Sequence, residues 1–281
     1  MEDAIIETEK VTEKQNLPVV SYSKVTSYKN CPRQYKFSYI DKLPRLEKPY
    51  TIFGQFCHEI LENFHRFYID PEDPNKKVNT EIQYCDTMKR CFLEAKQKWD
   101  PKLTKEQADE AYQIMLDYLI TISAISESDY PNITFVEKKI WLPIDDEFVL
   151  YGFIDRIQID KDGVLHVLDY KTTKDEKYLK DRTQLLLYAY TEHANNPKIE
   201  KVRTSYILLK HKMKLLSAEH NIDELIEAKN KFVGIWQTIK MDKLYRPTPI
   251  YFKCNMCDYV NQCKEGQSVL YKNKTFGKKA W

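Results

Sequence analysis

The fold of this chain is decided by the stretch that reads Tyr151-Gly-Phe-Ile-Asp155-Arg-Ile-Gln-Ile-Asp160-Lys-Asp-Gly163-Val-Leu-His-Val-Leu-Asp169-Tyr-Lys171. Its two halves, 149–159 and 164–168, are rich in the β-branched, aromatic and aliphatic residues that strands favour. Between them lies Asp162-Gly163, a typical turn dipeptide. The sequence therefore predicts an antiparallel pair of strands, which we call the central hairpin.

The central hairpin ends in charged residues where a core strand would carry apolar ones. Asp169 and Lys171 are two positions apart, so on a strand they point to the same face. Asp155, partway along the first strand, is expected to reach that face as well. Burying two carboxylates is costly unless a cation neutralises them. We therefore expect a cation-dependent site; the alternative is a surface hairpin in which Asp169 and Lys171 form an ordinary ion pair.

Helices and further strands surround the central hairpin. Apolar spacing predicts strands at 133–142, 199–210 and 211–216, and helices at 53–68, 80–99, 102–126, 181–193 and 221–240. Asn221 followed by Glu224 is a capping box that marks the start of the last helix. Two short helices are expected within 24–40, meeting at Cys31-Pro32. This order predicts an α/β domain with a mixed sheet flanked by helices.

A histidine on the helix at 53–68 is a further candidate residue. His58, Glu62 and His65 share one face of that helix. The helix does not carry the His-Glu-x-x-His pattern of metalloproteases, because Glu62 stands where the second histidine would be. A lone helical histidine is more often structural than a ligand, so the helical pattern alone leaves the role of His58 open.

Three cysteines near the end of the chain have the spacing of a metal site. They form the pattern Cys254-x2-Cys257-x5-Cys263, and the total of seven cysteines is an odd number that argues against a disulfide framework. Thiolates at this spacing suit zinc and an iron–sulfur cluster equally well. We interpret the cysteines at 57, 85 and 91 as ordinary thiols.

Five elements of the sequence together resemble the PD-(D/E)xK nuclease superfamily, and within it the RecB-like branch. The hairpin motif and Gln-x-x-x-Tyr are weak alone, but all five elements occur in the family's order over residues 20–265. The matching segments are Gly54–Glu62 (the helical histidine motif), Gly152–Asp155 (Gly-x-x-Asp), Asp169–Lys171 (Asp-x-Lys), Gln184–Tyr188 (Gln-x-x-x-Tyr), and Cys31 with Cys254, Cys257 and Cys263 (the iron–sulfur site of AddB-type and CRISPR-associated RecB-like nucleases).

The resemblance implies a restriction-endonuclease-like fold and a set of site residues. Asp155, Asp169 and Lys171 would be catalytic, and Mg²⁺ or Mn²⁺ would be held by His58, the two aspartates and the carbonyl of Tyr170. The remaining implied residues are Gln184 and Tyr188 as DNA contacts, and Cys31, Cys254, Cys257 and Cys263 as ligands of a [4Fe–4S] cluster that staples the N- and C-terminal segments together.

The resemblance further implies a DNA exonuclease that cuts from ends and prefers single strands, in recombination, repair or genome processing, including in a virus. The alternative is a non-catalytic DNA-binding or assembly subunit of a helicase–nuclease or CRISPR-adaptation complex. No Gly-x-x-x-x-Gly-Lys-[Ser/Thr] signature occurs, so unwinding must come from a partner such as a helicase or recombination protein.

Composition limits where a nucleic acid can bind. Charged residues make up 31% of the chain, yet the formal net charge is only +2, so any phosphate-binding surface must be local. Residues 21–50 hold seven Lys or Arg against two acidic residues, and 198–214 hold six against one. These are candidate phosphate contacts or, alternatively, solvated faces.

No apolar run of transmembrane length and no signal-peptide pattern occurs, so we expect a cytoplasmic protein without a membrane partner.

The expected domain organisation follows from these motifs. Residues 1–17 lack apolar periodicity and are expected to be a disordered tail. Residues 18–265 are expected to form one nuclease domain, with a helical insertion at 71–130 and a cluster-binding subregion made of 18–50 and 245–265. Residues 266–281 are expected to be a basic C-terminal tail.

Overall fold

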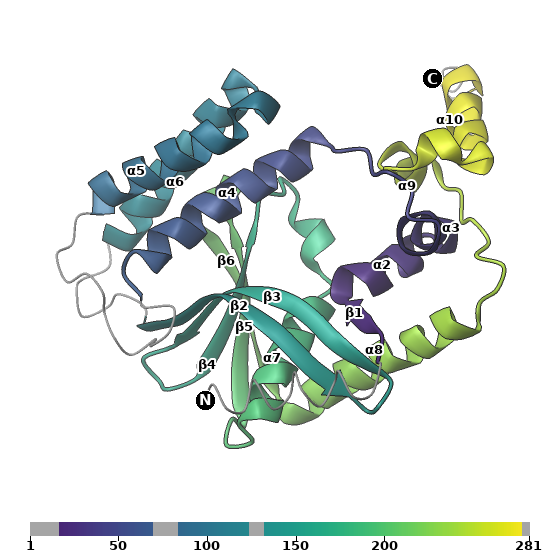
Figure 1. Ribbon diagram of the computed structural model, residues 1–281. Helices are drawn as coiled ribbons and strands as arrows, with labels where there is room; N and C mark the ends of the chain where they lie inside the picture. The colour runs from purple at the N-terminus through teal and green to yellow at the C-terminus, as the bar shows by residue number, and fades with distance from the viewer. Residues whose placement is uncertain (1–16, 70–83, 124–131, 277–281) are drawn as a thin grey trace. The chain divides into compact units, whose positions relative to one another are not determined.

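The computed structural model describes residues 17–69, 84–123 and 132–276 (Figure 1). Outside this range lie residues 1–16 of the expected tail at 1–17, two parts of the expected insertion (71–83 and 124–130) and the last five residues. The strands are β1 Val19–Ser21, β2 Asn132–Ile144, β3 Phe148–Ile159, β4 Leu165–Lys171, β5 Lys201–Leu208 and β6 Lys214–Asn221. The helices are α2 Tyr22–Asn30, α3 Pro32–Tyr35, α4 Pro49–Arg66, α5 Tyr84–Trp99, α6 Lys105–Ser123, α7 Thr183–Asn195, α8 Ile222–Met241, α9 Tyr251–Asn255 and α10 Lys264–Phe276.

The strands in the described residues form a mixed six-stranded sheet. Its order is β1-β3-β4-β5-β6, and β2 pairs with β3. β3 and β4 pair antiparallel, as predicted for the central hairpin, and Gly163 supplies the left-handed turn with a φ of 77°. β4 and β5 pair parallel, whereas β5 and β6 pair antiparallel. The predicted α/β class, with a mixed sheet flanked by helices, is therefore confirmed.

Several elements differ from the prediction, and three of the differences have a physical reason or bear on the predicted organisation. β1 was not predicted, because three residues are too few to carry a periodic pattern. β6 begins at Lys214 rather than at His211, since a 3₁₀ turn at 209–211 and the positive φ of Lys212 and Met213 interrupt the extended backbone. The predicted tail boundary at 265 falls within α10.

The described chain divides into two compact units that cross the predicted domain boundaries. One unit contains the described residues up to Lys48, Trp141–Tyr151, and the residues from Asn230 onward. The other contains Pro49–Ile140 and Gly152–Lys229, and therefore most of the central hairpin. We call them the terminal unit and the hairpin unit.

In the hairpin unit, helices α4, α5 and α6 lie side by side and cover one face of the sheet (Figure 1). Their apolar residues form one core with residues of β4, β5 and the segment that follows β5. Phe56, Ile60 and Phe64 of α4 are fully buried, and their spacing of four residues places them on one stripe of the helix. This packing fixes α4 over β4, because both contribute to the same core.

The terminal unit joins segments that are far apart in the sequence. Tyr28 donates a hydrogen bond from its hydroxyl to Asp242 Oδ2 at 2.8 Å, and Arg33 Nε donates to the carbonyl of Tyr245 at 3.1 Å.

Asn221 and Glu224 form the predicted capping box ahead of α8, each backbone N–H donating to the other's side chain. None of the described helices combines the length and the apolar character needed to cross a bilayer.

Candidate active site in the central hairpin

The site begins where the β3–β4 ladder ends. The paired residues run from Ile159 opposite Leu165 to Arg156 opposite Leu168. One residue further along β3, the carboxylate of Asp155 accepts a 2.8 Å hydrogen bond from the backbone N–H of Tyr170. The Asp155 side chain thus accepts a backbone hydrogen bond where the β3–β4 pairing has ended. This hydrogen bond holds the Asp155 carboxylate against the end of β4.

Asp169 and Lys171 lie on the same face of β4, as their spacing predicts. The Lys171 ammonium lies 2.6 Å from Asp169 Oδ2, and Asp169 is only 4% exposed. Burial lowers the pKa of Lys171, but the charges of Asp169 and Asp155 outweigh this effect, so the net shift of the Lys171 pKa is upward. Lys171 is therefore held as an ammonium ion in the metal-free protein.

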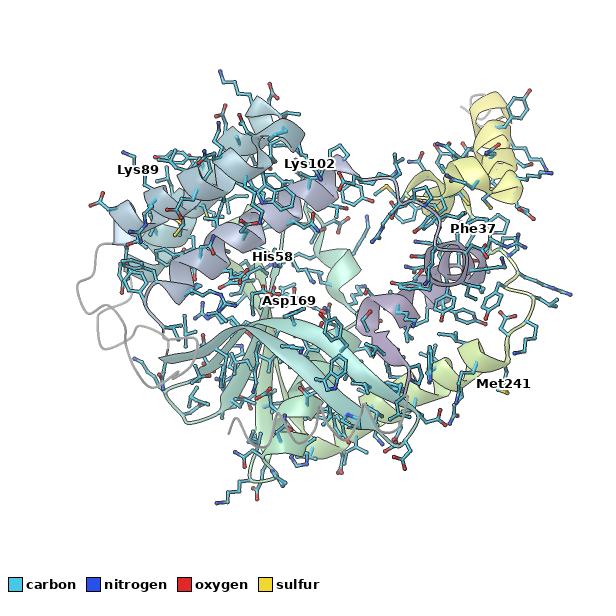
Figure 2. The ribbon with its side chains drawn as sticks, viewed as in Figure 1. Phe37, His58, Lys89, Lys102, Asp169 and Met241 are labelled. Atoms are coloured by element: carbon cyan, nitrogen blue, oxygen red, sulfur yellow. The ribbon has the colours of Figure 1, made fainter. Side chains whose placement is uncertain are left out.

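His58 on α4 reaches the same place from above the sheet. Figure 2 shows His58 on α4 facing the strand that carries Asp169. His58 Nε2 lies 2.9 Å from the carbonyl oxygen of Tyr170, and its Nδ1 lies 3.3 Å from Asp155 Oδ2. The four residues that the resemblance assigned to a divalent ion, His58, Asp155, Asp169 and Tyr170, therefore gather at the end of β4.

Glu137 on β2 joins this group and was not predicted. His58, Glu137 and Asp155 each offer one ligand atom, and these three atoms lie within 4.8 Å of one another. Burial, with the nearby charges of Asp155 and Glu62, raises the pKa of Glu137 to about 7. Burial is also the largest cause of the raised pKa of Asp155. Both carboxyls therefore resist ionisation in the absence of a cation.

The backbone explains why sequence reasoning missed Glu137. Its φ is 49°, in the left-handed region, although it lies inside a strand. Such a residue interrupts the alternation of side chains along β2: Ile133 and Ile140 are both buried although they are seven positions apart, an odd spacing that would place them on opposite faces of a regular strand. The only signal in the sequence is an acidic residue inside a predicted strand, which does not reveal a change of face.

Gln184 and Tyr188 of α7 lie beside the carboxylates. Gln184 Nε2 donates a 3.1 Å hydrogen bond to the Tyr188 hydroxyl. Burial, together with the charges of Asp169 and Asp155, raises the pKa of Tyr188 to about 12, so its hydroxyl stays protonated. A Cβ at Gly152 would lie 3.0 Å from that hydroxyl oxygen. Close approach of the Tyr188 ring thus accounts for the glycine in Gly152-x-x-Asp155.

Several polar residues near the site have structural partners instead. His65 is buried, with Nε2 2.6 Å from the Tyr118 hydroxyl, which agrees with a structural role. Asp160 pairs with Arg203 and His166 at the turn end of the hairpin. Glu62 pairs with Arg66 at 2.9 Å. Arg182 donates to the backbone carbonyls of Thr204 and Leu216.

The four cysteines with metal-site spacing meet in the terminal unit. Cys31 lies between α2 and α3, as predicted. One cavity there is lined by Cys31, Cys254, Cys257 and Cys263, and all four thiols are free and half-buried. Backbone N–H groups of Thr248, Tyr259 and Gly266 donate to the sulfurs of Cys31, Cys257 and Cys263 at 3.4–3.5 Å.

Comparisons with known proteins agree with part of the sequence interpretation. A family model described as "PD-(D/E)XK nuclease superfamily" matches residues 19–264. The solved structure "Crystal structure of SSO0001" is similar with 14% sequence identity and a TM-score of 0.34, over 76% of this chain and 94% of that chain. A search of curated proteins finds no match.

The raised pKa of Glu137 predicts how the metal-free protein responds to pH. Because the folded-state pKa of about 7 exceeds the ordinary 4.5, the protonated carboxyl stabilises the fold below about pH 4.5, and this contribution is lost as the pH rises through 7. In EDTA, the free energy of unfolding should therefore fall between pH 5 and 8, and Glu137→Gln should reduce that fall by about 1–2 kcal/mol. Urea unfolding at several pH values measures both.

Glu62→Gln is the matched control, since Glu62 is close to Glu137 but paired with Arg66. It should alter the pH dependence less than Glu137→Gln does. An unchanged pH dependence in Glu137→Gln would contradict the assigned burial of this carboxyl.

Proposed function

Since this chain belongs to the PD-(D/E)XK nuclease superfamily, we propose that it is a metal-dependent DNA exonuclease of the RecB-like branch, which degrades DNA from ends and prefers single strands. The observation that carries this proposal is the gathering of His58, Asp155, Asp169 and Lys171 at the end of the β3–β4 ladder. A surface hairpin would have no physical reason to bury two carboxylates there.

A divalent ion fits the donor set of this site. His58, Asp155, Asp169 and the Tyr170 carbonyl would hold Mg²⁺ or Mn²⁺, and the imidazole favours Mn²⁺ relative to an all-oxygen site. When bound, such an ion polarises the scissile phosphate and lowers the pKa of an attacking water. The raised pKa values of Asp155 and Glu137 support this fit, because a cation would relieve the burial of their charges.

Lys171 supplies positive charge to the reaction. Its pKa is raised by Asp169 and Asp155, which keeps the ammonium protonated and favours an electrostatic role over that of a general base. An ammonium at this position orients the attacking water and stabilises negative charge that develops on the phosphate.

Gln184 and Tyr188 position the DNA strand. The neutral Tyr188 hydroxyl is a hydrogen-bond donor beside the two aspartates, and the Gln184 amide fixes its orientation. A donor at this position can bind a phosphate oxygen of the strand being cut.

We further propose that Cys31, Cys254, Cys257 and Cys263 hold a [4Fe–4S] cluster. The four thiols line one cavity, and backbone N–H groups aimed at three of the sulfurs would stabilise thiolates. Thiolates at this spacing suit zinc and an iron–sulfur cluster alike, and the family resemblance is what favours the cluster. Its role would be structural, since it links segments distant in sequence.

The first prediction concerns cleavage. The protein with Mn²⁺ or Mg²⁺ should shorten end-labelled linear single-stranded DNA and leave closed circles intact. Lys171→Ala and Asp169→Ala should each lower the rate about a hundredfold or more, because the first removes positive charge at the reacting phosphate and the second removes a ligand of the metal ion. Lys174→Ala, which changes an exposed lysine three residues on, is the matched control.

Two outcomes would contradict this function. Cleavage of closed circles at the rate of linear DNA would replace the exonuclease by an endonuclease. DNA binding without cleavage by the folded wild type would favour the non-catalytic subunit, which would act with a helicase or recombination partner.

The second prediction concerns the cluster. Protein purified without oxygen should contain about four iron and four acid-labile sulfide per chain. Cys31→Ser should lower both and reduce the unfolding temperature, because the cluster would then lose the ligand from the N-terminal segment. Cys85→Ser, which changes an exposed thiol, should alter neither. Stoichiometric zinc without sulfide would end this proposal.

A further inference from the structure

Two carboxylates at the site remain when the other charged side chains are matched with partners of opposite charge. Lys171 lies 2.6 Å from Asp169, and Arg66 lies 2.9 Å from Glu62. Within the residues that the structure describes, neither Asp155 nor Glu137 has a lysine or arginine at ion-pair distance. One divalent cation would balance these two carboxylates, and two buried like charges so close to each other are unfavourable without one.

The contacts of His58 indicate where such a cation would lie. The Tyr170 carbonyl can only accept, so His58 Nε2 donates the 2.9 Å hydrogen bond between them. In the neutral imidazole, Nδ1 then presents a lone pair toward Asp155 Oδ2, 3.3 Å away. Two hydrogen-bond acceptors that face each other at 3.3 Å repel unless a proton or a metal ion lies beside them. Glu137 is the carboxylate that completes this group.

The position of Glu137 also depends on an unusual backbone conformation. A left-handed φ is unfavourable for a residue with a side chain and persists where the surroundings require it. Here it occurs at the residue of β2 whose carboxylate lies within 4.8 Å of ligand atoms from α4 and β3.

We propose that Glu137 is a metal ligand, which shares one divalent ion with His58 and Asp155. This assignment rests on the proposed nuclease function for its biological meaning, but its test is a binding measurement. The resemblance placed all acidic ligands on the two strands of the central hairpin. Since Glu137 lies on β2, this assignment brings a third strand into the metal site. Asp169 has the Lys171 ammonium as its nearest charge partner in this arrangement.

The test is titration of the full-length, anaerobically purified protein with MnCl₂ alone, with free Mn²⁺ followed by electron paramagnetic resonance. Glu137→Gln should weaken Mn²⁺ binding about tenfold or more, as Asp155→Asn should, because each removes a ligand oxygen's charge. Glu137→Asp keeps the carboxylate and should retain part of the affinity. Glu62→Gln removes a charge near Glu137 but no ligand, and it should bind Mn²⁺ within about twofold of wild type.

The outcomes separate this inference from the proposed function. Wild-type Mn²⁺ affinity in Glu137→Gln would overturn the assignment even if the protein cuts DNA. Equal losses in Glu137→Gln and Glu62→Gln would also overturn it, because the effect would then be one of general charge. Tenfold weaker binding in Glu137→Gln alone would support it even if no DNA substrate is cut. Glu137→Gln removes a buried charge, so urea unfolding in EDTA should show it at least as stable as wild type.

Discussion

An excess of negative charge at the end of the β3–β4 ladder is the constraint on which the site depends. Asp155 and Glu137 come within 4.8 Å of each other in a partly buried place. Two unit charges at about 4 Å repel by roughly 4 kcal/mol at the effective dielectric of a protein surface. Without a cation, burial and the charges of neighbouring carboxylates raise the pKa of both carboxyls, so that they resist ionisation. A bound cation turns the repulsion into attraction, which makes metal binding part of the local stability of the hairpin unit.

The surrounding fold holds these charges on rigid elements. α4 is fixed over β4 by a shared apolar core, so His58 cannot move away from Tyr170 without breaking that packing. Asp155 is held by a backbone N–H rather than by another side chain. Tyr188 packs against Gly152 on the strand that carries Asp155. Preorganisation of this kind keeps donors in place before the cation and the DNA arrive.

Much of this arrangement could be predicted from the sequence, because its signals are local. The turn at Asp162-Gly163 and the alternation on either side predict the hairpin, and the spacing of Asp169 and Lys171 places them on one face. Glu137 could not be predicted, since its position follows from a left-handed residue in the middle of a strand. The four cysteines needed the family resemblance, because Cys31 and Cys254 are too far apart in the sequence for spacing to relate them.

The most direct test of the central claim is anomalous X-ray diffraction from crystals of the protein soaked with MnCl₂. Our account predicts a manganese peak at the end of β4, at a bonding distance of about 2.0–2.4 Å from a His58 nitrogen and from an Asp155 oxygen. A fully ordered hairpin unit with no peak between these residues, or with Asp155 still paired only to the Tyr170 amide, would contradict it.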